Sequence, residues 1–218
     1  MEVLVTGANR GIGLEFVRQL AARGDTVHGA CRKSSPELDG LGVRVLEGVD
    51  VASDEQVASL AERLEGVDLD LLVNNAGILE RGGLEDLEWE SLRRQLEVNS
   101  LGPLRVTRAL LPNLGPGSRV AILTSLMGSI ADNGSGGYYG YRMSKAAVNA
   151  AGVSLARDLA PRSIPVFLLH PGMVATEMTG GRGIDVETSV TGLVERLDSL
   201  TPEESGTFWH TDGRELPW

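Results

Sequence analysis

Residues 3–13 read Val3-Leu4-Val5-Thr6-Gly7-Ala8-Asn9-Arg10-Gly11-Ile12-Gly13. The apolar start predicts a strand, and after the glycines apolar residues recur at helical spacing, at Ile12, Phe16, Val17 and Leu20. The glycines permit a tight turn and let backbone N–H groups approach a pyrophosphate at the helix N-terminus. The spacing is Gly-x-x-x-Gly-x-Gly rather than the usual Gly-x-Gly-x-x-Gly. A turn that binds nothing is the alternative, but strand and helix together favour nucleotide binding.

The same alternation of strand and helix continues along the chain. Short apolar runs predict further strands at 26–31, 43–46, 69–73, 119–123, 166–169 and 206–210. The longest predicted helices are at 84–111 and about 140–159. Residues 173–190, rich in glycine and without a period, predict a loop that either covers a substrate or is merely a surface loop. We expect one α/β domain over residues 1–218, a Rossmann fold whose doubly wound parallel sheet of about seven strands carries helices on both faces.

The composition of the chain argues against several classes of partner and site. The net charge of −10 argues against nucleic acid or an anionic membrane surface as the main partner. Cys31 is the only cysteine, which favours a reducing, cytoplasmic compartment. The three histidines and Cys31 are too scattered to predict a metal site. No run reaches the ~18 apolar residues of a membrane span, so we expect a small-molecule partner.

The end of the second predicted strand bears on cofactor choice. In dinucleotide folds an acidic residue there bonds the ribose 2′-hydroxyl, whereas an arginine accommodates a 2′-phosphate. Here Cys31 and Arg32 hold the position without a carboxylate, and Arg10 adds a second positive charge. Two solvated arginines are the alternative, but the pattern predicts NADP(H) in preference to NAD(H). Asp50, after the third strand, either bonds an adenine amino group or closes a turn.

The stretch Gly140-Tyr141-Arg142-Met143-Ser144-Lys145 carries the predicted chemistry. A helix would put Tyr141 and Lys145 on one face, one turn apart. A phenol, with a reference pKa of ~10, is a poor acid at neutral pH, and a nearby ammonium lowers that pKa. The pair could therefore pass a proton to or from an alcohol oxygen. Only Lys33 and Lys145 are lysines, which adds weight to a spacing that alone also fits an ordinary helix face.

Two further polar residues could support that pair. Ser125 follows the fifth predicted strand, where ligands bind in open α/β sheets, and its hydroxyl could hydrogen-bond a substrate oxygen. Asn99 lies among apolar residues and needs partners if buried; it either satisfies a helix carbonyl or holds a water leading toward Lys145. Asn74, at the end of the fourth strand, is expected to fix the neighbouring backbone.

Four segments, in this order, resemble those of the classical short-chain dehydrogenase/reductase family. They are Thr6-Gly7-x-x-x-Gly11-Ile12-Gly13, Asn74-Asn75-Ala76-Gly77, Tyr141-x-x-x-Lys145 and Pro171-Gly172. The resemblance spans about residues 1–176. Residues 139–145, His170-Pro171-Gly172 and residues 212–218 are similar to segments of C-factor and sniffer-like carbonyl reductases.

The resemblance implies a role for each matching residue. Tyr141 would be the catalytic acid/base, Lys145 would lower its pKa and hold the nicotinamide ribose, Ser125 would bind the carbonyl oxygen, and Asn99 would keep the water of a proton relay. Ser125 lies further before Tyr141 than in many members, so Ser129 remains a rival. The implied cofactor-binding residues are Thr6, Gly7, Asn9, Arg10, Gly11, Ile12, Gly13, Arg32, Asp50, Val51, Asn75, Ala76, Gly77, Tyr141, Lys145, Pro171, Gly172, Val174 and Thr176, the last meeting the carboxamide.

The resulting hypothesis is an NADPH-dependent reductase of aldehydes or ketones. Because C-factor relatives are linked to cell signalling, an NADP(H)-binding sensor with little turnover is one alternative. An NAD-dependent alcohol dehydrogenase is another. Family members often form homodimers or homotetramers through the two long helices, and the sequence leaves the oligomeric state open.

Overall fold

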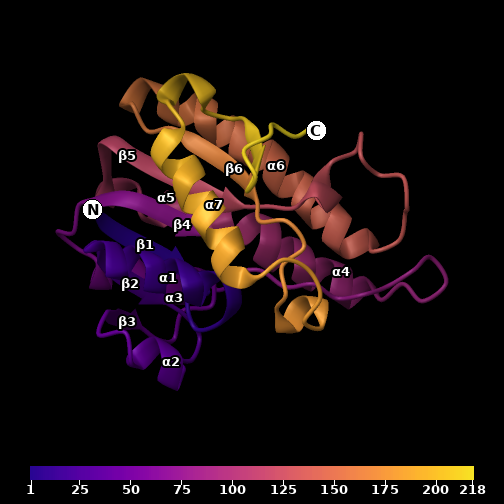
Figure 1. Ribbon diagram of the computed structural model, residues 1–218, viewed down its shortest axis with the longest axis horizontal. Helices are drawn as coiled ribbons and strands as arrows, with labels where there is room; N and C mark the ends of the chain where they lie inside the picture. The colour runs from indigo at the N-terminus through magenta and orange to yellow at the C-terminus, as the bar shows by residue number, and fades with distance from the viewer.

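The computed structural model describes residues 1–218 and contains one sheet of seven parallel strands, ordered β3-β2-β1-β4-β5-β6-β7 (Figure 1). The order reverses between β1 and β4, which is the switch point of a doubly wound fold. The predicted fold is therefore confirmed. The strands are β1 (Glu2–Thr6), β2 (Thr26–Ala30), β3 (Arg44–Leu46), β4 (Leu69–Asn74), β5 (Leu114–Leu123), β6 (Val166–His170) and β7 (Phe208–His210).

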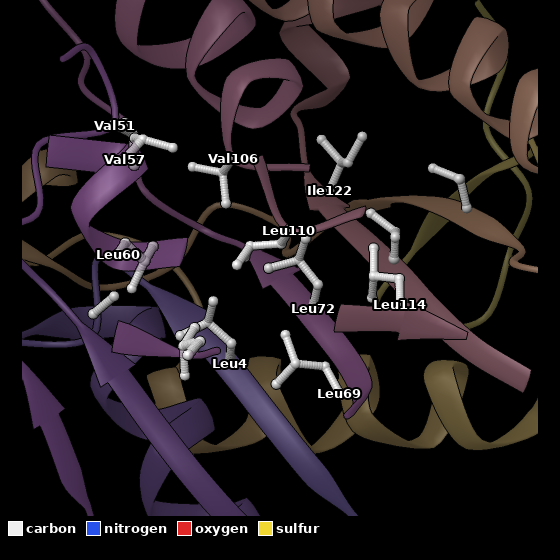
Figure 2. Packing of buried hydrophobic residues seen from close by; sticks show 14 of the residues in the cluster. Leu4, Val51, Val57, Leu60, Leu69, Leu72, Val106, Leu110, Leu114 and Ile122 are labelled. Carbon is white, nitrogen blue, oxygen red and sulfur yellow. The ribbon is translucent and has the colours of Figure 1, made fainter. Parts of the chain in front are cut away.

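Helices cover both faces of the sheet because strand side chains alternate between them. Val3 and Val5 of β1 pack with helices α1, α2 and α7, whereas Leu4 packs with α3, α5 and α6 on the other face (Figure 2). Both layers are built mostly from buried aliphatic side chains, and the layer of α1, α2 and α7 also contains Phe16 and Phe167. The α-helices are α1 (Gly11–Arg23), α2 (Pro36–Asp39), α3 (Asp54–Arg63), α4 (Trp89–Leu96), α5 (Gly102–Ala109), α6 (Tyr139–Leu159) and α7 (Val186–Ser199). None of them has the length and apolar character needed to cross a lipid bilayer.

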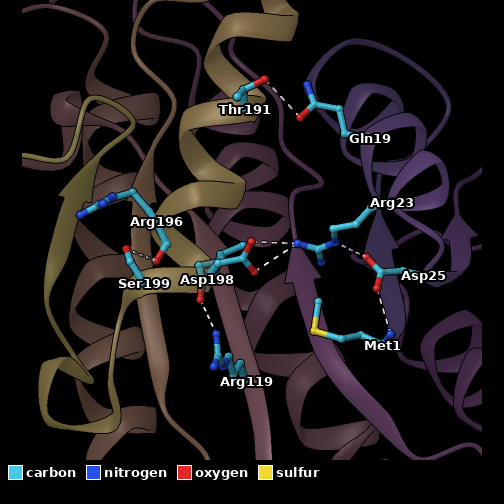
Figure 3. Close-up of polar contacts among 10 residues, drawn as sticks. Met1, Gln19, Arg23, Asp25, Arg119, Thr191, Arg196, Asp198 and Ser199 are labelled. Atoms are coloured by element: carbon cyan, nitrogen blue, oxygen red, sulfur yellow. Dashed lines mark hydrogen bonds and ion pairs between the residues drawn. The ribbon is translucent and has the colours of Figure 1, made fainter.

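The two edges of the sheet differ in chemistry. All strands run in parallel, so the segments after β1, β4, β5 and β6 meet at the carboxyl edge. At the amino edge, a polar network ties the chain start to α1 and α7 (Figure 3). The Met1 amino group donates to Asp25 (2.9 Å), and Arg23 donates to Asp25 (2.7 Å) and to Asp198 (2.9 Å). This edge stabilises the sheet at a distance from the predicted site.

The predicted helix at 84–111 differs from the observed one. It begins at Trp89 rather than Leu84, and a π-helical turn at Glu97–Leu101 separates α4 from α5. Such single turns often occur at functional sites, and this one contains Asn99. Apolar spacing alone does not reveal it, because a π-turn is fixed by what its side chains contact.

The predicted loop at 173–190 ends earlier than expected, since α7 begins at Val186. The sequence reasoning missed this helix, although Asp185 caps it and Val190, Leu193 and Leu197 have helical spacing and are buried. The 171–185 loop contains a short 3₁₀ turn at Glu177–Thr179. Strand β5 begins at Leu114, earlier than the predicted residue 119.

Candidate active site

The glycine loop between β1 and α1 requires its glycines. Gly7 and Gly11 have φ values of 67° and 54°, in the left-handed region that favours glycine. A Cβ at Gly13 would overlap the carbonyl group of Gly7. Asn75, after β4, donates its side-chain amide to the carbonyl oxygens of Thr6 (2.9 Å) and Gly7 (3.2 Å). The turn is therefore held to the neighbouring strand across the switch point.

The end of α1 at this loop fits a dinucleotide. Arg10 is the N-cap but makes no capping hydrogen bond with its side chain, and the first turn contains no acidic residue. The N–H groups of that turn and the positive end of the helix dipole are thus available to a diphosphate. Thr6 ties the start of the glycine loop to the segment after β4, because its hydroxyl oxygen accepts from the N–H groups of Asn75 and Ala76 (3.1 Å each).

Ser125, Tyr141 and Lys145 come together at the carboxyl edge, and all three are buried. Ser125 follows β5, its hydroxyl oxygen accepts from the Met127 N–H (3.1 Å), and it is near enough to the Tyr141 phenol to lower the pKa of that group. The Lys145 ammonium lies 5.8 Å from the centre of the Tyr141 ring and donates to the carbonyl of Leu123 (2.8 Å). Gly128 makes this approach possible, since a Cβ there would lie 2.7 Å from the carbonyl carbon of Lys145.

Burial is the main cause of the pKa shifts of Tyr141 and Lys145. It raises the pKa of Tyr141 to about 12, against the lowering effect of the Ser125 hydroxyl, and it lowers the pKa of Lys145 to about 8. The expectation that the Lys145 ammonium lowers the pKa of the Tyr141 phenol is therefore wrong for the protein without a bound cofactor. The Lys145 head group is directed to Leu123, and the desolvation of the phenol outweighs its other interactions. Tyr138, just before α6, has φ of 50°, a strained conformation beside the site.

Asn99 is buried within the π-turn, and both N–H donors of its side-chain amide are occupied. Its Nδ2 donates to the Ile78 carbonyl (2.8 Å) and the Ser144 hydroxyl (2.9 Å), and its Oδ1 accepts from the Ile78 N–H (2.8 Å). Asn99 therefore satisfies a backbone carbonyl, as one of the two expectations had it, but Ile78 lies in the loop after β4 rather than in a helix. A lone pair of Oδ1 remains for a water. Asn74 was expected to bond the neighbouring backbone, but its side-chain amide instead donates to the Thr107 hydroxyl of α5 (3.1 Å), which is also a structural role.

The rival serine has a different partner. Ser129 is buried, and its hydroxyl oxygen accepts from the N–H of Asp132 (3.1 Å), where it caps a turn in the 128–137 loop. Of the two serines, only Ser125 acts on the Tyr141 phenol, whose pKa it lowers. The geometry therefore favours Ser125 as the serine of the site.

The predicted adenosine side of the site is less closely organised. Arg32 is exposed and makes no ion pair, whereas Arg10 pairs with Glu177. Asp50 accepts from the Ala52 N–H (3.0 Å) and so closes its own turn. Asn9 accepts a hydrogen bond from Ser35 through its carbonyl oxygen (2.8 Å).

The remaining predicted residues lie in the 171–185 loop and beside Asp50. Val51 is buried, and its carbonyl accepts from Arg105 (2.8 Å). Pro171 accepts from Ser189 (2.7 Å). Gly172 has φ of 81°, and the methyl group of Thr176 would lie 3.5 Å from a Cβ at Gly11, which brings this loop to the start of α1.

Two residues near the site were missed by the sequence reasoning. Glu177 meets Arg10 from 167 positions away, and no local pattern signals such a contact. His170, at the end of β6, is buried with an unpartnered Nδ1 and lies edge-on to His210, with ring centres 5.0 Å apart. Burial, together with the nearby His210, Arg214 and Lys145, lowers the pKa of His170 to about 3. The sequence feature that could have pointed to His170 is that it directly precedes Pro171-Gly172.

Comparison with known proteins identifies the family of the chain. The model of the short chain dehydrogenase family matches residues 2–186. The 1-hydroxy-2-glutathionyl-2-methyl-3-butene dehydrogenase of Rhodococcus sp. (strain AD45) is 45% identical over 223 residues, 99% of each chain. The C-signal protein of Myxococcus xanthus is 46% identical over 154 residues, which are 69% of this chain and 93% of that protein. An NADPH-bound carbonyl reductase from chicken fatty liver is similar in structure, with a TM-score of 0.91, 30% identity and coverage of 100% of this chain and 98% of the other. The chain therefore belongs to the short-chain dehydrogenase/reductase family of oxidoreductases.

Proposed function

We propose that this protein is an NADPH-dependent reductase that converts an aldehyde or a ketone to an alcohol. The supporting observation is the buried cluster of Tyr141, Ser125 and Lys145, in which the Lys145 ammonium lies 5.8 Å from the centre of the Tyr141 ring. When bound, the nicotinamide cofactor supplies the hydride for the carbonyl carbon. The residues that would hold it are those of the glycine loop, the β4 end and the 171–185 loop.

The chain itself handles the oxygen and the proton. Because burial holds the pKa of Tyr141 at about 12, its phenol is protonated at neutral pH and can donate to a more basic alkoxide. The Ser125 hydroxyl can hydrogen-bond the same oxygen and stabilise its developing charge. The Lys145 ammonium can then return a proton to the tyrosinate.

A pair of tyrosine variants tests the reaction. Tyr141→Phe should lose roughly 100-fold to 10,000-fold in turnover, the range for a missing general acid, while it still binds NADPH. Tyr139→Phe, at an exposed position two residues before Tyr141, is the control and should stay near wild type. Near-normal turnover by Tyr141→Phe would refute the assigned role.

The preference for NADPH rests on Arg32, which is exposed, has no acidic partner and can therefore receive a 2′-phosphate. Paired titrations of NADPH and NADH should show that Arg32→Asp loses affinity for NADPH by at least about tenfold, while NADH binding changes little. Arg108→Asp, the same charge change at an exposed site on α5, should affect neither. An equal loss for both cofactors would contradict the selectivity argument.

Two relatives support other candidates. The Rhodococcus enzyme is named as the dehydrogenase of a hydroxy compound that carries a glutathionyl group, which supports oxidation of a similar alcohol. The similarity to C-signal supports a nucleotide-binding sensor. Carbonyl compounds with NADPH and alcohols with NAD, including a glutathionyl alcohol, should be assayed side by side. Reduction alone supports the proposal, oxidation alone the dehydrogenase, and cofactor binding without turnover on either panel the sensor.

A further inference from the structure

One ion pair joins the glycine loop to the 171–185 loop. The Arg10 guanidinium donates to the Glu177 carboxylate, and no other ion pair links these two loops. Both side chains are largely exposed, at 68% and 78%. The contact therefore forms at the surface, where an incoming anion can reach it.

Arg10 lies at the start of α1, and the 171–185 loop approaches the same place. Arg10 is extended, with φ of −163°, and caps the helix without a side-chain hydrogen bond. The Thr176 methyl group would be 3.5 Å from a Cβ at Gly11. Glu177 thus brings a negative charge to the helix end that fits a diphosphate.

Glu177 is held in place by its own turn. Thr176 and Thr179 cap the turn reciprocally, and the Thr176 N–H donates to the Thr179 hydroxyl (3.1 Å). The Thr179 hydroxyl also donates to the Val174 carbonyl (2.6 Å), and Val174 forms a bridge to Ile184. The carboxylate is therefore carried on a hydrogen-bonded turn that presents it to Arg10.

Arg10 and Arg32, the two arginines predicted to lie near the adenosine, differ in their ion pairing. Arg32 makes no ion pair, whereas Arg10 is already paired with an acid. A carboxylate and a phosphate use the same guanidinium N–H groups, and the two anions repel each other at short range. A phosphate that uses Arg10 must therefore displace Glu177.

We propose that Glu177 is a selectivity residue that competes with the cofactor 2′-phosphate for Arg10. The inference rests on the proposed use of NADP(H). Glu177 neutralises Arg10 when the ribose carries a 2′-hydroxyl, and it yields Arg10 to a 2′-phosphate. The NADPH preference is thereby weaker than two unpaired arginines would give. Because exposed ion pairs are weak, the effect is several-fold rather than thousand-fold.

Binding titrations with adenosine 2′,5′-bisphosphate and with AMP isolate this effect from the nicotinamide chemistry. They should be run at one low ionic strength, because salt screens exposed charges. Glu177→Gln is expected to tighten the bisphosphate about threefold to tenfold and to leave AMP within about twofold. Glu187→Gln removes an exposed acid of α7 that has no ion pair and should change neither affinity. In an Arg10→Gln background, the effect of Glu177→Gln should disappear.

Several results would overturn the inference: equal changes for both nucleotides, weaker bisphosphate binding by Glu177→Gln, an unchanged effect without Arg10, or a wild-type chain that binds neither nucleotide. Failure of the reductase proposal has a separate signature. A wild-type chain that binds the bisphosphate but reduces no carbonyl would refute the reaction, and the Glu177 titrations would still decide the selectivity role.

Discussion

Replacing Lys145 by methionine should abolish turnover while changing how stability depends on pH. Lys145 is buried, and burial lowers its pKa from 10.5 to about 8. Between these values the unfolded chain holds a proton that the folded chain has lost, so wild-type stability rises with pH. At 1.36 kcal/mol per pH unit, the rise amounts to roughly 3.4 kcal/mol across that window.

Lys145→Met lacks this rise, because methionine does not titrate. The variant also removes the donor to the Leu123 carbonyl, which costs about 1–3 kcal/mol at every pH. That loss lowers the free energy of unfolding by the same amount at every pH and does not alter its dependence on pH. The stability of the variant relative to wild type should therefore fall by roughly 3 kcal/mol between pH 8 and 10.5.

Urea unfolding of both proteins at half-unit steps of pH, without added cofactor, measures the difference directly. Tyr141 is present in both chains, so its titration cancels to first order. The chain offers one matched control, since Lys33 is the only other lysine and is exposed. Lys33→Met should give a flat difference. A flat difference for Lys145→Met as well would show that Lys145 does not titrate in this window and would refute the reasoning.

Three further outcomes are expected. Gly13→Ala should lose NADPH binding, because its Cβ has no room, whereas Gly134→Ala, in open space, should bind normally; equal binding in a titration would contradict the packing. Between pH 6.5 and 5, His170→Asn should lose about 2 kcal/mol less stability than wild type. The reason is that the folded pKa of His170 is about 3, so only the unfolded wild-type chain binds a proton at this histidine in that range; urea midpoints at both pH values test this. Arg23→Ala should lose about 1 kcal/mol of stability in the same assay and keep its activity, and lost activity would contradict the separation of the two edges.

Features carried by contiguous sequence were predicted well. The strand–glycine–helix start at residues 3–13 and the alternation of apolar runs were sufficient for the sheet and its winding. The spacing of Tyr141 and Lys145 placed them on one helix face, because a helix fixes that geometry locally. These predictions depend on periodicity, which a single sequence displays directly.

Features that depend on burial and long-range contact were not accessible. Tyr141 was expected to have a lowered pKa, yet desolvation raises it, and desolvation depends on how α6 packs. The Arg10–Glu177 pair joins residues 167 positions apart. The π-turn around Asn99 arises from hydrogen bonds to Ile78 and Ser144, and only the folded chain brings these together.

That π-turn also constrains how the length of this chain can vary. A π-turn contains one residue more than an α-helical turn, and each residue rotates a helix by about 100°. Deleting one residue within 97–101 would restore a regular helix, but it would also swing either Asn99 or the buried face of α5 away from its partners. Insertions and deletions should therefore accumulate in the loops at 81–88 and 130–137, while the segment 89–109 keeps a constant number of residues.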